Sequence, residues 1–246
     1  MRVFAIADPH LSRADPKPMT IFGPGWEGHP DAFFHGWRSV VTDDDLVLVP
    51  GDLSWAMRLE DALLDLEDIA ALPGRKVILR GNHDYWWPSI SKLRRSLPEG
   101  MYAVQNDAIV IDGVVVAGTR GWACPGSRGF VEQDEKIYRR EAERLALSLS
   151  AAADLEGDYR VVMLHFPPTN PRLEPSEFTR LVEAAAPDAL VFGHVHGEQD
   201  GVLKRLGGVD VHFVAADALG FVPRLLCDLE RRRSGDVAVR AGSTRR

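Results

Sequence analysis

The sequence predicts an α/β fold built on a largely parallel sheet. Short, continuous apolar runs at residues 2–7, 46–50 and 76–80 have the length and composition of strands that are buried on both faces. Between the second and third runs, residues 58–72 place leucines on one helical stripe and carboxylates on the other. A strand, a helix and a second strand in this order indicate parallel neighbours that are joined by right-handed crossovers.

The N-terminal half contains one irregular segment among these regular elements. Residues 11–30 are rich in glycine and proline and carry Phe22 and Trp26, so we expect either a lid over a site or simple packing. A helix is predicted over 31–41, and Pro73-Gly74 ends the helix at 58–72.

The rest of the chain continues the alternation. Predicted helices cover 89–97, 132–152 and a segment that Ser176 caps and that runs to about Ala186. Two or three strands lie within 101–118, with Asp112-Gly113 as a hairpin turn. Further strands are predicted at 160–164, 189–192, 201–206, 209–215, 224–230 and 236–240. We expect mostly parallel pairing early in the chain and antiparallel pairing late. No repeat or linker interrupts the 246 residues, which predicts one domain over 1–246.

Polar residues follow five of the apolar runs directly, and five of the eight histidines are among them. Ligands of open α/β sheets bind beyond the carboxyl ends of the strands, so these residues are candidates for chemistry. The segments are Asp8-Pro9-His10, Gly51-Asp52, Gly81-Asn82-His83-Asp84, His165 and Gly193-His194-Val195-His196.

Seven of these side chains form a plausible metal-ligand set. They combine carboxylate, amide and imidazole donors without a thiolate, which suits Mn, Fe or Zn and is too rich in nitrogen for calcium. Seven ligands are too many for one tetrahedral ion but fit two ions, and Asp52 is the natural bridge. Each motif alone is also compatible with a structural role, and only their joint occurrence is specific. The set is Asp8, His10, Asp52, Asn82, His165, His194 and His196.

In this pattern the chain resembles the calcineurin-like metallophosphoesterases, over roughly residues 1–220. Segments around Trp86-Trp87, Thr119–Trp122 and Lys136–Arg140 resemble a bacterial subgroup of predicted phosphohydrolases. The resemblance implies a four-layer α/β/β/α sandwich with two mixed sheets and two metal ions at one end of the sheets.

Roles for individual residues follow from the same resemblance. It implies that Asp8, His10 and His196 hold the first metal, that Asn82, His165 and His194 hold the second, and that Asp52 bridges them. His83 would be the catalytic imidazole. The Asp-Arg-Gly that follows Gly-Asp in protein Ser/Thr phosphatases is absent after Asp52, which disfavours a protein phosphatase and leaves the partner of His83 open. Asp84 is the nearest candidate in sequence.

The predicted function is hydrolysis of phosphate mono- or diesters with two bound di- or trivalent ions, Mn being favoured over Fe or Zn. A bridging hydroxide would be the nucleophile, and His83 would protonate the leaving group. The alternatives are a nuclease acting on single-stranded or exposed nucleic acid ends and an inactive binding protein on the same fold.

The composition and charge of the chain limit the kinds of molecule that it is expected to bind. A formal net charge of −7 disfavours duplex nucleic acid, whereas two bound cations would still attract a small phosphoester. Arg80 and Arg128 are candidate phosphate contacts. Trp86 is a candidate substrate contact, since the tryptophans of these loops could form either a stacking wall or packing. No apolar stretch reaches membrane-spanning length, and two distant cysteines indicate no disulfide framework, so a cytoplasmic protein is expected. The sequence indicates no oligomeric state.

Overall fold

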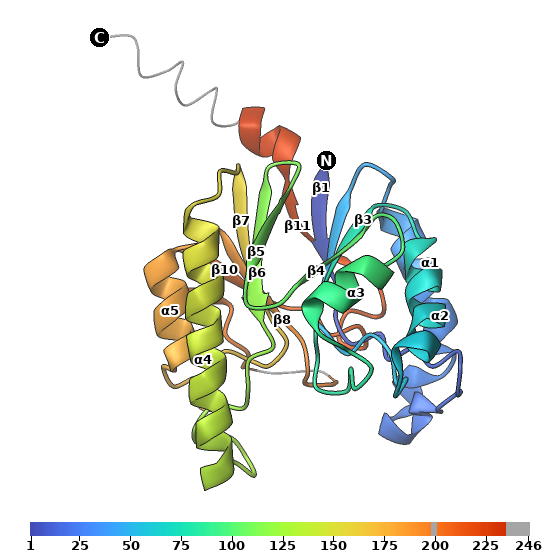
Figure 1. Cartoon of the computed structure of the whole chain (residues 1–246), viewed down its shortest axis with the longest axis horizontal. Coiled ribbons are helices and arrows are strands. Elements are labelled where there is room, and N and C mark those ends of the chain that lie inside the picture. The colour runs from blue at the N-terminus through green and yellow to red at the C-terminus, as the bar shows by residue number, and fades with distance from the viewer. Residues whose placement is uncertain (198–200, 235–246) are drawn as a thin grey trace.

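The computed structural model describes residues 1–197 and 201–234. Two sheets pack face to face, and each is covered on its outer face by helices (Figure 1). This arrangement confirms the predicted α/β/β/α layers with two mixed sheets.

The first sheet has the strand order β11-β1-β2-β3-β4. The pairs of β1 with β2, β2 with β3, and β3 with β4 are parallel, while β11 runs antiparallel to β1. The strand bounds are Arg2–Ala5 for β1, Leu46–Val49 for β2, Arg75–Leu79 for β3, Met101–Val104 for β4 and Arg224–Asp228 for β11. The carboxyl ends of β1, β2 and β3 therefore meet at one edge.

The second sheet has the strand order β5-β6-β7-β8-β10-β9. Its four central strands, β6, β7, β8 and β10, are parallel to one another, and both outermost pairs are antiparallel. The bounds are Ala108–Ile111 for β5, Val114–Thr119 for β6, Tyr159–Leu164 for β7, Ala189–Phe192 for β8, Arg205–Leu206 for β9 and Val209–Phe213 for β10. The predicted turn at Asp112-Gly113 joins β5 to β6.

Within the part of the chain that the structure describes, three helices cover the first sheet and two cover the second (Figure 1). The first group is α1 (His29–Val40), α2 (Leu59–Ala70) and α3 (Ile90–Ser96), and the second is α4 (Glu132–Ala153) and α5 (Glu177–Ala185). Ser176 caps α5 as predicted, because its side chain accepts a hydrogen bond from the backbone N–H of Thr179. The helices thus begin and end close to where hydrophobic periodicity placed them.

Side-chain alternation explains why the strands read as continuous apolar runs. In β1 and β2, Phe4 and Val47 face the helices, whereas Val3, Ala5 and Leu46 face the second sheet. Successive side chains of a strand point to opposite faces, and here both faces are buried.

Several expectations for the later strands were wrong. β10 is parallel to β8, so late pairing is not uniformly antiparallel. Of the segment 201–206 only Arg205–Leu206 is a strand, and the strand predicted at 224–230 ends at Asp228, where a short helical segment follows. The strand predicted at 236–240 lies outside the described residues.

The close approach of α1 to the loop before β11 gives a test of the packing. A Cβ on Gly36 would lie 2.2 Å from the backbone oxygen of Phe221. Helix propensity alone would make Gly36→Ala stabilising by up to about 1 kcal/mol. We expect it instead to lower the free energy of unfolding by about 1–3 kcal/mol, because overpacking forces the backbone apart.

Urea unfolding of Gly36→Ala measures this change. Gly25→Ala is the matched control, since an added Cβ there meets no atom within 4 Å. A Gly36→Ala protein at least as stable as the parent would contradict the packing described here.

Candidate metal centre

The polar segments predicted to meet do meet. Those that follow β1, β2 and β3 come from the first sheet, and those that follow β7 and β8 come from the second. Asp8, His10, Asp52 and His165 are each at most 1% exposed. Because both sheets present carboxyl ends at this edge, five distant segments contribute to one cluster.

One group of donors forms around Asp8, His10 and Asp52. Their ligand atoms all lie within 4.8 Å of one another, and His10 Nε2 is 3.7 Å from Asp52 Oδ2. The His196 ring lies beside this group, with its centroid 5.2 Å from that of His10. The four residues predicted for the first metal and the bridge are therefore neighbours.

A second group forms around the amide of Asn82. Its Oδ1 is 2.7 Å from His165 Nε2 and 2.8 Å from His194 Nδ1. His165 Nε2 also lies 3.4 Å from Asp52 Oδ2, the same oxygen that faces His10. Asp52 thus stands between the two groups, which is the position that a bridging carboxylate requires.

The backbone at this cluster is unusual. Asp8, His10, Asp52 and His194 all have positive φ, between 45° and 72°, a region that residues other than glycine adopt rarely. Such strain persists only where surrounding structure imposes it, and it concentrates at functional sites. Here it turns the chain sharply at each strand end, so that the side chain lies at the sheet edge.

Gly193 is required at its position by close packing. A Cβ there would lie 2.2 Å from Asp8 Oδ2, an oxygen that accepts a hydrogen bond from the backbone N–H of His194 at 2.9 Å. The glycine of the Gly-His-x-His motif therefore makes room for the carboxylate of the first motif.

Asp84 binds backbone and does not orient His83. Its oxygens accept hydrogen bonds from the backbone N–H groups of Asp52, Leu53 and Gly81 at 2.7–2.9 Å. Further donors are Ser54 N at 3.3 Å and Trp86 Nε1 at 3.0 Å. Among the described residues, no hydrogen bond joins Asp84 to the His83 imidazole. The expectation of an Asp84–His83 pair is corrected: this carboxylate fixes two turns of the site.

His83 is held by its backbone and by an aromatic neighbour. The backbone N–H of His83 donates a hydrogen bond to Asp52 Oδ1 at 2.8 Å, and the His83 ring lies against Trp55 with centroids 4.4 Å apart. Burial lowers the pKa of His83, partly offset by the Asp52 carboxylate. The ring borders the first group of donors, with its centroid 5.7 Å from that of His10.

Asp217 belongs to the site and was missed from the sequence. Its Oδ1 lies 3.3 Å from His196 Nδ1, and its Oδ2 accepts a hydrogen bond from Gly197 N at 2.6 Å. A carboxylate on one imidazole nitrogen fixes the tautomer and orientation of a metal-binding histidine. Asp217 follows an apolar run at the end of β10, which is the signal that marked the other five segments.

Charges at the cluster leave two imidazoles able to bind a cation. Burial lowers the pKa of both His10 and His194 to about 3, so each is neutral at pH 7. Burial also acts on His165, but Asp52 outweighs it and raises the pKa to about 9. Burial raises the pKa of Asp8 to about 7. In the absence of a metal, the cluster therefore holds its own counter-charge on His165.

Unpartnered atoms show that a metal fits this cluster. Asp8 Oδ1 and both ring nitrogens of His10 are buried without a hydrogen-bond partner within the described residues. Buried polar atoms are nearly always paired, so these orphans need a missing partner. A cation bound by carboxylate, imidazole and amide donors would satisfy Asp8 Oδ1 and one ring nitrogen of His10, and this donor set suits Mn, Fe or Zn.

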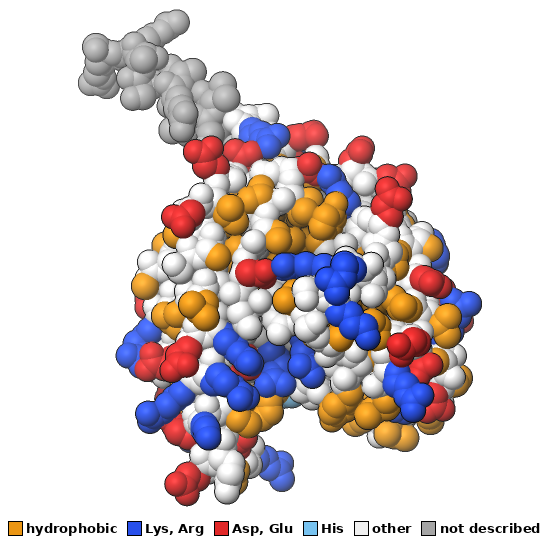
Figure 2. Space-filling view, viewed as in Figure 1, with side chains coloured by type: hydrophobic (Ala, Val, Ile, Leu, Met, Phe, Trp, Pro, Cys, Tyr) orange, Lys and Arg blue, Asp and Glu red, His pale blue; other side chains and the backbone are white. Residues whose placement is uncertain are grey.

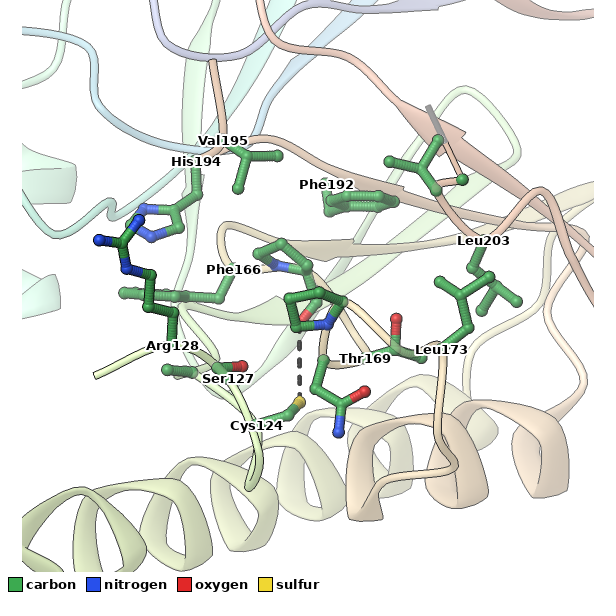
Figure 3. Close-up of a pocket in the computed structure, with 16 residues that line it drawn as sticks. Cys124, Ser127, Arg128, Phe166, Thr169, Leu173, Phe192, His194, Val195 and Leu203 are labelled. Carbon is green, nitrogen blue, oxygen red and sulfur yellow. Dashed lines mark hydrogen bonds between the residues drawn. The ribbon is translucent and has the colours of Figure 1, made fainter. Parts of the chain in front are cut away.

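The candidate substrate contacts lie in different places. Trp86 is 3% exposed and packs in the core between the first sheet and its helices, so it cannot contact substrate in this structure. Its predicted role is corrected to structural. Arg128 lines a cavity of about 300 Å³ together with His194 and Phe166 (Figure 3). Arg80 lines a separate cavity.

Segment 11–30 and the tryptophans of the loops each had two predicted roles, and in the structure both are largely packed against the protein. The segment 11–30 contains short 3₁₀ helices at Met19–Phe22 and Pro24–Trp26, and Trp26 is buried against the rings of His10 and His196. Trp87 is 5% exposed, whereas Trp55 and Trp122 are only half-buried. Trp55, like Trp26, contacts the His10 ring, and it also lies against His83.

Comparison with known proteins places the chain in a family. Residues 1–198 match the model of the calcineurin-like phosphoesterases, and the chain belongs to this family. Its members are generally metal-dependent phosphoesterases. No curated protein matches this chain in sequence.

Two solved structures share the fold. The protein TT1561 of Thermus thermophilus is 15% identical, with a TM-score of 0.58 and coverage of 94% of this chain and 96% of that one. The phosphopantetheinyl hydrolase PptH of Mycobacterium tuberculosis is 17% identical, with a TM-score of 0.55 and coverage of 92% and 95%. These likenesses extend to the fold alone. Within the described residues, no helix is both long enough and apolar enough to cross a membrane.

The hydrogen bonds of Asp84 can be tested without any metal. Asp84→Asn replaces an acceptor oxygen with an NH₂ group that faces backbone donors, leaving at least one buried donor unpaired. We expect the free energy of unfolding to fall by about 3 kcal/mol, measured by urea unfolding in excess chelator.

Asp44→Asn, at an exposed turn position, is the control and should leave stability within about 0.5 kcal/mol of the parent. Equal stability of both variants would show that Asp84 does not hold the turns together.

Proposed function

We propose that this protein is a dinuclear metal-dependent hydrolase of small phosphate mono- or diesters. The observation that carries the proposal is the convergence of donor atoms around Asn82 Oδ1 and Asp52 Oδ2. Without a metal, the His165 imidazolium donates from Nδ1 to the backbone oxygen of Pro50 at 3.0 Å and from Nε2 to Asn82 Oδ1 at 2.7 Å. A cation bound at this position would take the place of the Nε2 proton and supply the same positive charge beside Asp52.

In this proposal the two groups of donors hold one ion each. Asp8, His10 and His196 hold the first, Asn82, His165 and His194 hold the second, and Asp52 contacts both. Bound cations of this kind offset phosphoryl charge and lower the pKa of coordinated water. Mn is the favoured metal because the donors are mixed oxygen and nitrogen without sulfur.

The protein's own contributions are position, exclusion of water and a proton. The left-handed turns and the Asp84 hydrogen bonds fix the donors before any ion arrives, which avoids reorganisation during the reaction. His83, held by Asp52 and Trp55, would give a proton to the departing alkoxide. Burial lowers its pKa in the free protein, and the negative charge of a bound phosphoester would raise that pKa again.

The surroundings favour a small ester over a long polyanion. The cavity beside His194 is about 300 Å³, the lower end of the range for small-molecule sites, and Phe166, Phe192 and Leu203 are among its apolar walls. It could take the organic part of an ester whose phosphate lies at the metal centre. The formal net charge of −7 disfavours the many peripheral contacts that nucleic acid needs.

Metal removal tests the proposal directly. Chelated and desalted protein should lose hydrolysis of an aryl phosphate or phosphodiester, and added Mn²⁺ should restore it. Asp52→Asn should lose bound metal and activity together, measured by elemental analysis and turnover, because both groups of donors share Asp52. Asp44→Asn should match the parent in both. Turnover that survives complete metal removal would refute the proposal.

The role of His83 predicts a separation of metal binding from rate. His83→Ala should retain the metal of the parent, since His83 is outside the proposed ligand set, yet lower kcat by about 10²–10⁴-fold on esters with poor leaving groups. The loss should shrink on nitrophenyl esters, whose leaving group needs no proton. His35→Ala, on an exposed position of α1, is the control. Equal losses on both kinds of ester would contradict the acid role.

A further inference from the structure

A second cavity beside the metal centre is lined by arginines. It has a volume of about 220 Å³ and lies where β3, β4 and β6 end against α4. Its walls carry four guanidinium groups and one carboxylate, those of Arg80, Arg120, Arg140, Arg144 and Glu141. This cavity therefore has a local surplus of three positive charges in a protein whose formal net charge is −7. Figure 2 shows Lys and Arg side chains gathered near the lower centre of the face of the molecule that it displays.

The single carboxylate does not neutralise this cavity. Glu141 Oε1 pairs with Arg144 at 2.6 Å and with Arg120 at 3.4 Å, and Glu141 Oε2 faces the hydroxyl of Thr119 at 2.8 Å. Among the described residues, Arg80 and Arg140 have no acidic partner within ion-pair distance, and Arg80 Nε is buried without a hydrogen-bond partner. Two guanidinium groups therefore remain uncompensated.

One amide of the cavity has its acceptor occupied, because Gln105 Oε1 accepts a hydrogen bond from Trp87 Nε1 at 2.7 Å. The single hydroxyl proton of Thr119 lies between Glu141 Oε2 at 2.8 Å and Asn106 Oδ1 at 3.0 Å and can be donated to one of them. With Gln105 and Glu141 engaged inside the protein and the guanidinium donors of Arg80 and Arg140 left over, the cavity suits a ligand group that only accepts hydrogen bonds. Phosphate and carboxylate are such groups, and the planar guanidinium binds both in a bidentate manner.

The cavity adjoins the metal centre through two short connections. Arg80 precedes the proposed ligand Asn82 by two residues, so their Cα atoms are at most about 7 Å apart. The backbone oxygen of Arg120 accepts hydrogen bonds from His165 N at 3.0 Å and Phe166 N at 3.1 Å. At about 220 Å³ the cavity is too small for a whole drug-sized ligand, which indicates a subsite for one group of a larger molecule.

We infer that this arginine cavity binds a second anionic group of the substrate, so that the preferred substrate is a small phosphoester carrying a further phosphate or carboxylate. That the bound molecule is a substrate rests on the proposed hydrolase function. Binding of an anion in the arginine cavity does not depend on a bound metal. Arg80 and Arg140 act as binding residues, one from the end of β3 and one from α4.

The first experiment needs no catalysis. Inorganic phosphate is titrated calorimetrically into chelator-treated full-length protein and into the variants Arg80→Gln and Arg140→Gln. Each variant should bind phosphate about tenfold more weakly, because each loses a charged donor. Arg139→Gln is the matched control: it removes the same charge from the preceding residue of α4, where Arg139 is 73% exposed and paired with Glu135. Its affinity should equal that of the parent.

The second experiment compares substrates with Mn²⁺ present. KM for a sugar bisphosphate should rise about tenfold in Arg80→Gln and Arg140→Gln and by a clearly smaller factor for a nitrophenyl phosphate, which has no second anionic group, whereas Arg139→Gln should keep the KM of the parent for both substrates. Phosphate affinity that is absent, or unchanged by both substitutions, overturns the inference even if hydrolysis is intact. Phosphate binding that depends on Arg80 and Arg140 without metal-dependent turnover keeps the anion site and refutes only the hydrolase.

Discussion

The buried carboxylate of Asp84 is the interaction on which the geometry of this site depends. It accepts hydrogen bonds from backbone N–H groups at the ends of β2 and β3, the two turns that carry Asp52 and Asn82. A charged acceptor shared among several buried N–H donors is strong and directional, and losing it leaves each donor unsatisfied. Two adjacent strand ends are thereby locked at a fixed separation, which a site with a shared carboxylate ligand requires.

The left-handed turns at the candidate site destabilise the folded protein, and the packing of the two sheets compensates for this. Four proposed ligands adopt positive φ, and Asp8 and Asp52 are two carboxylates buried at the same sheet edge. Neither feature favours folding by itself. Two stacked sheets with apolar side chains on both faces supply the stability that tolerates them. The imidazolium of His165, whose pKa Asp52 raises to about 9, offsets part of the acidic charge in the absence of metal.

Much of this architecture could be predicted from sequence because its signals are local. Apolar run length, helical periodicity and the capping residue Ser176 act within a few residues, and parallel strands bring their polar ends to one edge. The direction of β10 and the partners of Asp84 depend on tertiary neighbours, so adjacency in sequence gave the wrong partner for Asp84. From the sequence, Trp86 is predicted to lie in a loop near the site. In the structure its indole N–H donates a hydrogen bond to Asp84 and its ring packs in the core. Asp217 could have been predicted from the sequence, since it too follows an apolar strand.

The order of strands also determines what can surround a bound ester. In the second sheet β7 lies between β6 and β8, so His165 at the end of β7 is flanked by the residues that follow its two neighbours. After β6 come Arg120 and the arginine cavity, and after β8 come His194 and the apolar cavity. The candidate metal centre therefore lies between a strongly basic cavity and a largely apolar one. An ester with an anionic group at one end and an organic group at the other would be favoured in one orientation by this asymmetry, because the arginine cavity has four guanidinium groups for the anion, whereas the cavity lined by Phe166, Phe192 and Leu203 has only that of Arg128.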